Sequence, residues 1–473
     1  MPSPLQSPRL RRIIVAYTVN RLGTWFGYVA LSLAVFAHTH SALAVAALLV
    51  TGQALPAFLA PAVVARIEAS SRRAQLSALY LFEGLVTTAL AALLWRQFWL
   101  PGILLLVALD GTIALAASAL LRAAAARGAR EWAHTHHEQI APENLTAHTY
   151  AGQVGAALVA GGQAIEYGTV STGAGGAREV SALEAERKAN AALNIGFSGT
   201  FVMGPALAGV VVAIAGGPVA LLIDAVSFLV CGAMLLDLHL HVEESGGASV
   251  QARLRAAWEH INDMTTLRRL LLVEGFALVF FASDGAIEVP YAKVTLQAGD
   301  RGYGLLLTAW GLGMVVGSLV FARLIRRPLG AILSAGTLAV GLAYIGWAVA
   351  PSLALACTAG LLGGIGNGVQ RAGFISTVQR LTPQNLHGQM MGAVESLGAI
   401  SPAIGLSLGG ALVALSSPRD AFLIVGLGAA LSTVAFVRLP LGKLTGTPSA
   451  PAAVDEDLEW APEQPPSSMV NAP

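Results

Sequence analysis

The sequence predicts an all-α integral membrane protein with twelve transmembrane helices. Three observations support this: hydrophobic residues make up 55% of the 473 residues, charged residues make up only 12%, and the apolar residues fall into separate long runs. A helix needs about 20 residues to cross the hydrocarbon core of a bilayer, and each run has about that length. Soluble domains carry about 25% charged residues, so this composition excludes an ordinary soluble fold.

The twelve runs are separated by short polar segments, and each is expected to form one helix. In chain order they cover 13–37, 42–65, 74–95, 99–121, 192–215, 217–237, 270–291, 303–324, 329–350, 353–376, 387–413 and 420–438. The first run contains Asn20 and Arg21 and is followed at once by further apolar runs. We therefore expect it to remain in the mature protein rather than to be cleaved as a signal peptide.

The distribution of basic residues predicts the orientation. With the N-terminus inside, the outer loops hold only Arg96, Lys293, Arg301 and Arg419, and most of the 28 Lys and Arg residues lie on the inner side. This asymmetry follows the positive-inside rule, so both termini are predicted to be cytoplasmic. The net charge is +1 and the basic residues are dispersed, so no nucleic-acid partner is expected.

Two short segments recur in both halves of the chain, as expected for a duplicated transporter architecture. Val64-Ala65-Arg66-Ile67 resembles Phe321-Ala322-Arg323-Leu324, and Gly204-Pro205-Ala206-Leu207 resembles Ser401-Pro402-Ala403-Ile404. The two segments lie farther apart in the first half, so an insertion is expected there. The predicted units are helices one to four over 1–121, a cytoplasmic insertion over 122–191, helices five and six over 192–240, a central cytoplasmic linker over 241–269, a second six-helix bundle over 270–440 and a disordered tail over 441–473.

Several motifs resemble those of the major facilitator superfamily over residues 10–440. They are Gly204-Pro205-Ala206-Leu207-Ala208-Gly209, Asp224-Ala225-Val226-Ser227-Phe228, Tyr303-Gly304-Leu305-Leu306 and His387-Gly388-Gln389-Met390-Met391. More narrowly, the chain resembles the exporter branch, which includes enterobactin-exporter-like and multidrug efflux permeases. This resemblance implies two six-helix bundles, alternating access, and a monomer in the plasma (inner) membrane of a bacterium.

The Gly204-Pro205 segment resembles the antiporter motif of that superfamily, which implies exchange with protons. Gly permits close approach of the two bundles and Pro bends the helix, although a kink needed only for packing would look the same. The resemblance assigns gating or helix-interface roles to seven residues: Gly204, Pro205, Gly209, Pro402, Glu395, Arg66 and Arg323. Two departures weaken proton coupling, because Ala65 replaces the acidic residue of the first gating loop and the fourth helix carries Asp110 instead of an arginine.

Charged residues within the predicted helices are candidates for function, because each costs about 2.5 to 3.5 kcal/mol at the helix centre on insertion scales. In the resembled fold, helices one, four, seven and ten line the central cavity. Carboxylates there are candidates for proton coupling, since a dry environment favours the protonated form and a nearby arginine opposes it. Our candidates for proton coupling are Asp110, Asp284 and Glu288, and those for substrate binding or switching are Arg21, Asn20, Arg371, Trp25 and Trp310.

A static buried ion pair that fixes helix register remains an alternative for these charges. Glu83 and Asp224 lie on helices three and six, which are peripheral in the resembled fold, so we expect structural hydrogen bonding for both. His134, His136 and His137 have no accompanying Cys or second ligand pair, so no metal site is expected.

The sequence contains no G-x-x-x-x-G-K-[ST] loop and no hydrolase or metalloenzyme motif. We therefore expect no enzymatic activity and no cofactor. The predicted function is a proton-coupled exporter of small amphipathic molecules such as a drug, siderophore or metabolite. An importer or facilitator of a polar metabolite, and a non-transporting membrane receptor or accessory protein with the same fold, are the alternatives. The expected partners are a small-molecule substrate, protons and the lipid bilayer.

Overall fold

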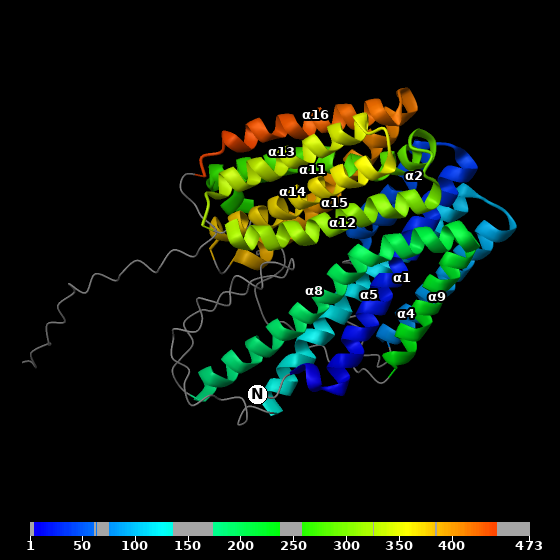
Figure 1. The fold of residues 1–473 in the computed structure, drawn as a ribbon. Coiled ribbons are helices and arrows are strands. Elements are labelled where there is room, and N and C mark those ends of the chain that lie inside the picture. Colours follow the sequence, from blue (N-terminus) through cyan, green and yellow to red (C-terminus); the bar gives the residue numbers. More distant parts are fainter. Residues whose placement is uncertain are drawn as a thin grey trace, which may run out of the picture.

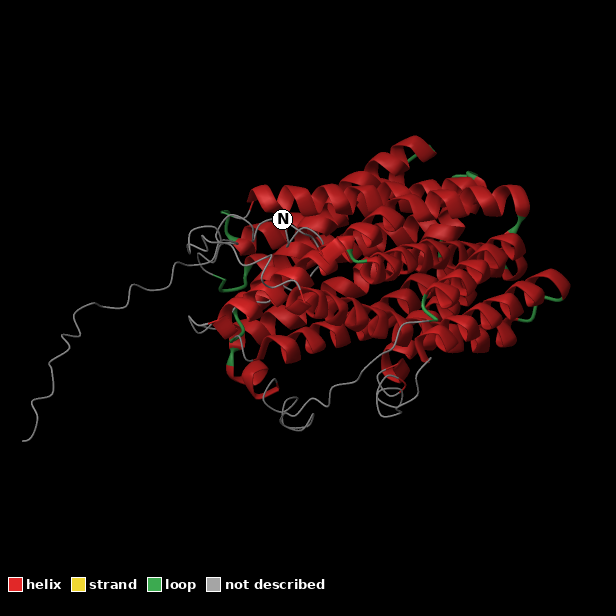
Figure 2. Ribbon diagram, turned by 90° about the horizontal axis from the view of Figure 1, so that it is seen from below, coloured by secondary structure: helices red, strands yellow, loops and turns green. Residues whose placement is uncertain are grey.

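The computed structural model describes residues 4–60, 63, 75–135, 174–236, 258–324, 326–383 and 386–441, and these residues are almost entirely helical (Figure 2). Twelve helices among them are long and apolar enough to cross a membrane. The prediction of twelve transmembrane helices is therefore confirmed. Arg66, which was predicted to be a gating residue, lies outside the described residues, and so does the chain from residue 442 onward.

Six of the spans come from each half of the chain. The first six are α1 (Pro8–Thr39), α2 (Ala42–Leu49) with its π-helical continuation η2 (Val50–Ala54), α4 (Gln75–Arg96), α5 (Leu100–Thr135), α8 (Ala174–Ala215) and α9 (Gly217–Met234). The last six are α11 (Thr265–Pro290) with its π-helical continuation η5 (Tyr291–Thr295), α12 (Gly299–Leu324), α13 (Leu329–Val349), α14 (Leu353–Arg380), α15 (His387–Leu415) and α16 (Pro418–Val437). A short 3-10 helix, η1 (Pro4–Gln6), precedes α1.

The two sets of six helices form two bundles that meet at one end and diverge toward the end that carries the N-terminus (Figure 1). We call them the N-terminal half and the C-terminal half. The contact between them is made chiefly by α8 against α12 and by α2 against α11 and α15. Helix pairs with many small residues can approach closely in this way.

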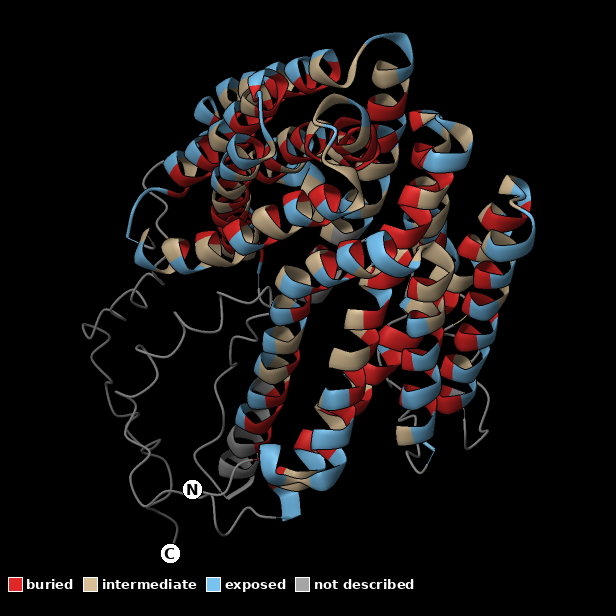
Figure 3. Ribbon diagram, turned by 45° about the vertical axis from the view of Figure 1, so that its right-hand side comes forward, coloured by how far each residue is buried: buried red, intermediate tan, exposed pale blue. Residues whose placement is uncertain are grey.

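Large apolar side chains cover the outer surface of both halves, where Figure 3 shows many exposed positions on the outward faces of the helices. Leu105, Ile214, Leu272 and Leu431 are among the exposed ones. A protein surrounded by water rarely exposes such an extended apolar surface, whereas lipid tails accommodate it. The exposed surface thus agrees with the twelve spans.

Helices α5 and α8 extend well beyond a bilayer. The sequence placed the end of the fourth helix at 121 and the start of the fifth at 192, but α5 continues to Thr135 and α8 begins at Ala174. With 36 and 42 residues, they measure about 54 and 63 Å, against about 30 Å of hydrocarbon. The extension is rich in alanine, which favours helix where hydropathy has already fallen.

The extended ends of α5 and α8 pack through buried alanines and one ion pair. Ala125 and Ala129 of α5 share a core cluster with Ala185 and Ala189 of α8. Beside them, Arg130 Nε donates to Glu186 Oε2 over 2.7 Å. The two helices therefore stay together beyond the spanning region.

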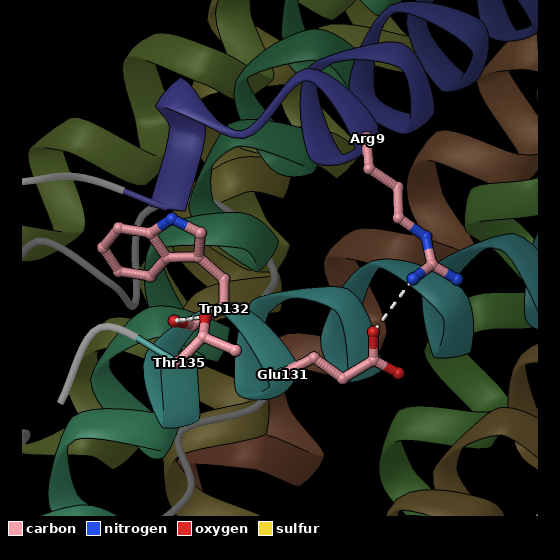
Figure 4. Close-up of polar contacts among 4 residues, drawn as sticks. All are labelled: Arg9, Glu131, Trp132 and Thr135. Carbon is pink, nitrogen blue, oxygen red and sulfur yellow. Dashed lines mark hydrogen bonds and ion pairs between the residues drawn. The ribbon is translucent and has the colours of Figure 1, made fainter.

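The start of α1 also lies against the end of α5 (Figure 4). Arg9 Nη1 donates to Glu131 Oε2 over 2.9 Å, and Thr135 Oγ1 donates to the Trp132 carbonyl oxygen over 2.9 Å. Both members of the ion pair are exposed, so the pair contributes at most about 1 kcal/mol. Leu10 of α1 is buried in the same core cluster as Ala125 and Ala129 of α5, and this apolar contact holds the two helices together more strongly than the ion pair.

Candidate functional site

A cavity of about 360 Å³ lies inside the N-terminal half, between α1, α2 with η2, α4, α5 and α9. We call it the N-half cavity. Its wall carries three carboxyl groups and one guanidinium, those of Glu83, Asp110, Asp224 and Arg21, each from a different helix. The rest of the wall is largely apolar and includes Leu31, Leu49, Leu90, Val107, Leu221 and Phe228. The cavity thus concentrates charge within apolar surroundings.

Arg21 is held by neutral partners. Its Nη2 donates to Ser118 Oγ over 3.0 Å, and its guanidinium carbon lies 5.4 Å from the centroid of the Tyr17 ring and 5.8 Å from that of Phe197. Its Nε is buried without a hydrogen-bond partner. No carboxylate among the described residues lies within 4.0 Å of the guanidinium, so the static ion pair that we considered for Arg21 is not formed here.

Asp110 of α5 is in hydrogen-bond contact with the Thr87 hydroxyl of α4. Thr87 Oγ1 lies 3.1 Å from Asp110 Oδ1 and 2.9 Å from the carbonyl oxygen of Glu83, one helical turn earlier. A hydroxyl has a single proton, so Thr87 can donate to only one of these oxygens at a time. Asp110, a predicted proton-coupling residue, therefore shares its hydrogen-bond donor with a backbone carbonyl group.

Glu83 and Asp224 lie in the same cavity, although we predicted peripheral structural roles for them. Glu83 is completely buried and neither carboxylate oxygen has a hydrogen-bond partner, and Asp224 is buried with its Oδ1 unpartnered. Among the described residues, the structure thus shows no hydrogen-bond partner for the Glu83 carboxylate or for Oδ1 of Asp224. Buried polar groups without partners are rare in proteins and point to a missing ligand or proton.

Two glycines of α1 make room for Asp224. A Cβ on Gly23 would lie 2.6 Å from Asp224 Oδ1, and a Cβ on Gly27 would lie 2.5 Å from Oδ2. The two glycines are four residues apart, so they lie on the same face of α1. This spacing shows in the sequence that α1 has a face open to close approach, but the sequence does not show that Asp224 is the residue that approaches it.

The other two proton-coupling candidates, Asp284 and Glu288, lie on α11 in the C-terminal half and do not line the N-half cavity. The Tyr344 hydroxyl donates to Asp284 Oδ2 over 2.9 Å and lies 2.7 Å from the Phe281 carbonyl oxygen. Glu288 is buried one turn further along α11. Between these two carboxylates, a Cβ on Gly285 would lie 3.8 Å from the hydroxyl of Tyr28 on α1, so this stretch of α11 faces the N-terminal half.

The remaining binding candidates are dispersed. Asn20 is buried and lines the N-half cavity. Trp25 packs edge-on against Phe201 of α8, with ring centroids 5.1 Å apart, and covers Gly204. Arg371 is an exposed residue of α14, beside the buried Gln370, whose Nε2 donates to Glu274 Oε2 over 2.6 Å. The structure therefore brings only Asn20, Arg21 and Asp110 of the candidates into one cavity.

Trp310 lies in an aromatic cluster of the C-terminal half instead of a cavity. It is buried and stacks on Tyr344 with ring centroids 5.5 Å apart, next to Trp347. The Trp347 ring also meets Phe422 at 4.9 Å. This position favours a packing role for Trp310, with its neighbour Tyr344 linking the cluster to Asp284.

The predicted interface residues of α8 meet α12. A Cβ on Gly209 would lie 3.0 Å from the Gly304 Cα atom, and a Cβ on Gly304 would lie 2.6 Å from the carbonyl oxygen of Pro205. Pro402 is half-buried within α15, and further along that helix a Cβ on Gly410 would lie 2.7 Å from the Ala46 Cβ atom of α2.

The other predicted gating residues give less information. Arg323 is exposed at the end of α12. Arg66 lies outside the described residues, and the side chain of Glu395 in α15 is likewise not among those described. No group of three or more His, Cys, Asp or Glu side chains in the described part of the chain is arranged to hold a metal ion.

Comparison with known proteins supports the same architecture. Residues 275–468 match the family model described as Major Facilitator Superfamily. No curated protein sequence matches the chain. Many solved structures do match it, and three of them illustrate the range.

The first of the three is the crystal structure of the nucleoside transporter NupG, with a TM-score of 0.67 at 10% identity, covering 92% of this chain and 99% of that one. The second is a bacterial homologue of the iron transporter ferroportin in an inward-facing state, with a TM-score of 0.60 at 17% identity, covering 92% and 99%. The third is a bacterial homologue of the human lysosomal transporter Spinster, inward-facing and unoccupied, with a TM-score of 0.57 at 11% identity, covering 91% and 95%. The chain therefore has the same fold as these solved transporters, and residues 275–468 are similar to the Major Facilitator Superfamily.

Proposed function

We propose that the protein is a secondary active transporter that exports small amphipathic molecules in exchange for protons by alternating access. The observation that carries this proposal is the N-half cavity, in which Asp110, Glu83 and Asp224 lie with Arg21 among apolar side chains. Intramembrane carboxylates of this kind mark proton relays and substrate paths in membrane proteins. The apolar wall suits the apolar part of an amphipathic molecule.

The arrangement of the two halves supports alternating access. They touch where α8 meets α12 through Gly209 and Gly304 and where α2 meets α15 through Ala46 and Gly410. In the predicted orientation this contact lies at the outer end of the helices, which corresponds to an inward-facing state. Two of the similar solved structures are also inward-facing. Transport then requires rocking of the halves about these contacts.

Coupling in this proposal depends on competition for the carboxylates. Release of a proton from Asp110 changes the charge of the N-half cavity in which substrate would bind, while Arg21 lines the same cavity. In the C-terminal half, Asp284 has Tyr344 as a partner and lies where α11 faces Tyr28. Protonation of Asp284 would thus act beside a contact between the two halves, and protonation of Asp110 would act inside the N-terminal half.

The test is proton-gradient-driven uptake of fluorescent amphipathic dyes into inverted vesicles that contain the purified protein. We expect accumulation that an uncoupler abolishes, and we expect Asp110→Asn and Asp284→Asn to lose it. Glu131→Gln is the matched control, because Glu131 is an exposed carboxylate at the far end of the same helix as Asp110. Its uptake should equal that of the unchanged protein.

The opposite results would separate the alternatives. Uptake that survives both Asn substitutions would reject the assigned coupling residues. Absence of gradient-dependent uptake across a broad dye panel would reject the exporter proposal in favour of a permease for a polar metabolite or a non-transporting receptor.

A further inference from the structure

We propose that the N-half cavity is itself a binding site for a small amphipathic organic cation, and that Glu83 and Asp224 are its charge partners. The inference deepens the transport function proposed above and rests on it. It places substrate within one half of the molecule, between α1, α4, α5 and α9, and it gives a direct role to two residues that the sequence placed at the periphery.

The first argument is charge. Three carboxylates and one guanidinium line the cavity, so its wall carries an excess of acidic groups. Arg21 does not satisfy them, because no carboxylate lies within 4.0 Å of it among the described residues and Ser118 is its hydrogen-bond partner. A ligand that enters this space is favoured when it is positively charged.

The second argument is the state of the carboxylates. Glu83 is completely buried with both oxygens unpartnered, and Asp224 is buried with Oδ1 unpartnered, while both line the cavity. Burying such groups without partners is costly, and a ligand that offers positive charge would remove that cost. Asp110 is different, because Thr87 already reaches it.

The third argument is the space itself. A cavity of about 360 Å³ is far larger than an inorganic ion and lies within the range of small-molecule sites. The described residues contain no group of three or more acidic, His or Cys side chains arranged around a metal ion. Leu90, Val107 and Phe228 provide apolar contact, and Tyr28 adds an aromatic ring that can interact with a cation.

The experiment is equilibrium binding of radiolabelled benzyltrimethylammonium to the full-length protein in lipid nanodiscs, without any gradient. We expect saturable binding that the uncharged carbon isostere, neopentylbenzene, does not displace. Glu83→Gln and Asp224→Asn should each weaken binding about 10- to 100-fold, the usual effect of losing one contact to a charged group. Ala114→Phe should also abolish binding, because it fills the cavity and changes no charge.

The matched control is Glu274→Gln. Glu274 is equally buried but lies in the C-terminal half, where Gln370 is its partner, so its removal should leave the affinity unchanged. Size-exclusion profiles and melting temperatures of all variants identify any that fail to fold, and the folded Ala114→Phe variant then provides an independent test of the cavity.

Equal displacement by the uncharged isostere would overturn the inference, and so would affinity that survives Glu83→Gln, Asp224→Asn and Ala114→Phe. Binding without any vesicle transport would count against the proposed transport function alone. Dye transport by a protein that does not bind the cation here would count against this site alone.

Discussion

Gly209 of α8 and Gly304 of α12 bring the two halves of the molecule into backbone contact. A Cβ on Gly209 would lie 3.0 Å from the Gly304 Cα atom, and one on Gly304 would lie 3.2 Å from the Gly209 Cα atom. No side chain fits between them. The contact therefore determines how closely the halves can approach at this end.

Gly304→Ala should push the halves apart at this contact. The added Cβ would lie 2.6 Å from the Pro205 carbonyl oxygen, and overpacking of this kind costs about 1 to 3 kcal/mol. We expect a lower melting temperature in detergent and a longer spin-label distance between α8 and α12. Gly199→Ala on α8 is the control, since nothing lies within 4 Å of its Cβ position. An unchanged distance in Gly304→Ala would show that this contact does not set the spacing.

Gly27→Ala should displace the Asp224 carboxylate from its place against α1. The new Cβ would lie 2.5 Å from Asp224 Oδ2, so either the carboxylate or the helix must move. We expect weaker binding or slower transport together with a loss of about 1 to 3 kcal/mol in stability. Alanine in place of glycine usually stabilises a helix, so the free position Gly128→Ala on α5 should be neutral or slightly stabilising. Equal stability and equal transport in Gly27→Ala and Gly128→Ala would contradict the close approach of Asp224 to Gly27.

Tyr344→Phe should release Asp284 from its hydroxyl partner. The lost hydrogen bond to a buried carboxylate costs about 1 to 3 kcal/mol. We expect a lower melting temperature and altered gradient-driven uptake. Tyr291→Phe is a matched control, because its hydroxyl donates to the Trp347 carbonyl oxygen and to no carboxylate. It should lower stability without changing uptake, and a double-mutant cycle of Tyr344→Phe with Asp284→Asn should show coupling.

Arg419→Lys should weaken the contact between the start of α16 and the end of α13. The guanidinium donates to the carbonyl oxygens of Ala348 over 2.9 Å and of Ala350 over 2.8 Å, and a lysine cannot reproduce this fork. We expect a loss of about 1 to 2 kcal/mol, measured as a lower melting temperature, with normal binding in the N-half cavity. A melting temperature equal to that of the unchanged protein would show that these two bonds are not important for stability.

The twelve helices could be predicted because each requires only length and apolar composition, which are local properties of the sequence. The residues at which helices begin and end were harder to predict. The apolar run that ends near residue 121 is followed by an Ala-rich segment, and α5 continues through it to Thr135. High helix propensity and packing against α8 keep this segment helical although its hydropathy is too low for a membrane span.

The candidate site could be predicted only in part, for a physical reason. Arg21 and Asp110 were identified because a charge within an apolar run is visible in the sequence. The grouping of Glu83 and Asp224 with them depends on how α4 and α9 pack against α1, which is a tertiary relationship. Trp310 shows the converse, since an aromatic residue on an apolar helix looks the same in sequence whether it lines a cavity or stacks on Tyr344.

The length of α8 has a consequence for any motion of this protein. It is one continuous helix that contacts α12 at Gly209 and begins 35 residues earlier, at Ala174, about 52 Å away. A tilt of about 5° around that contact would swing the far end by about 5 Å and leave the glycine pair almost in place. Displacement along α8 therefore grows with distance from Gly209, and reporter groups near Glu186 would register small rotations that reporters close to Gly209 would scarcely detect.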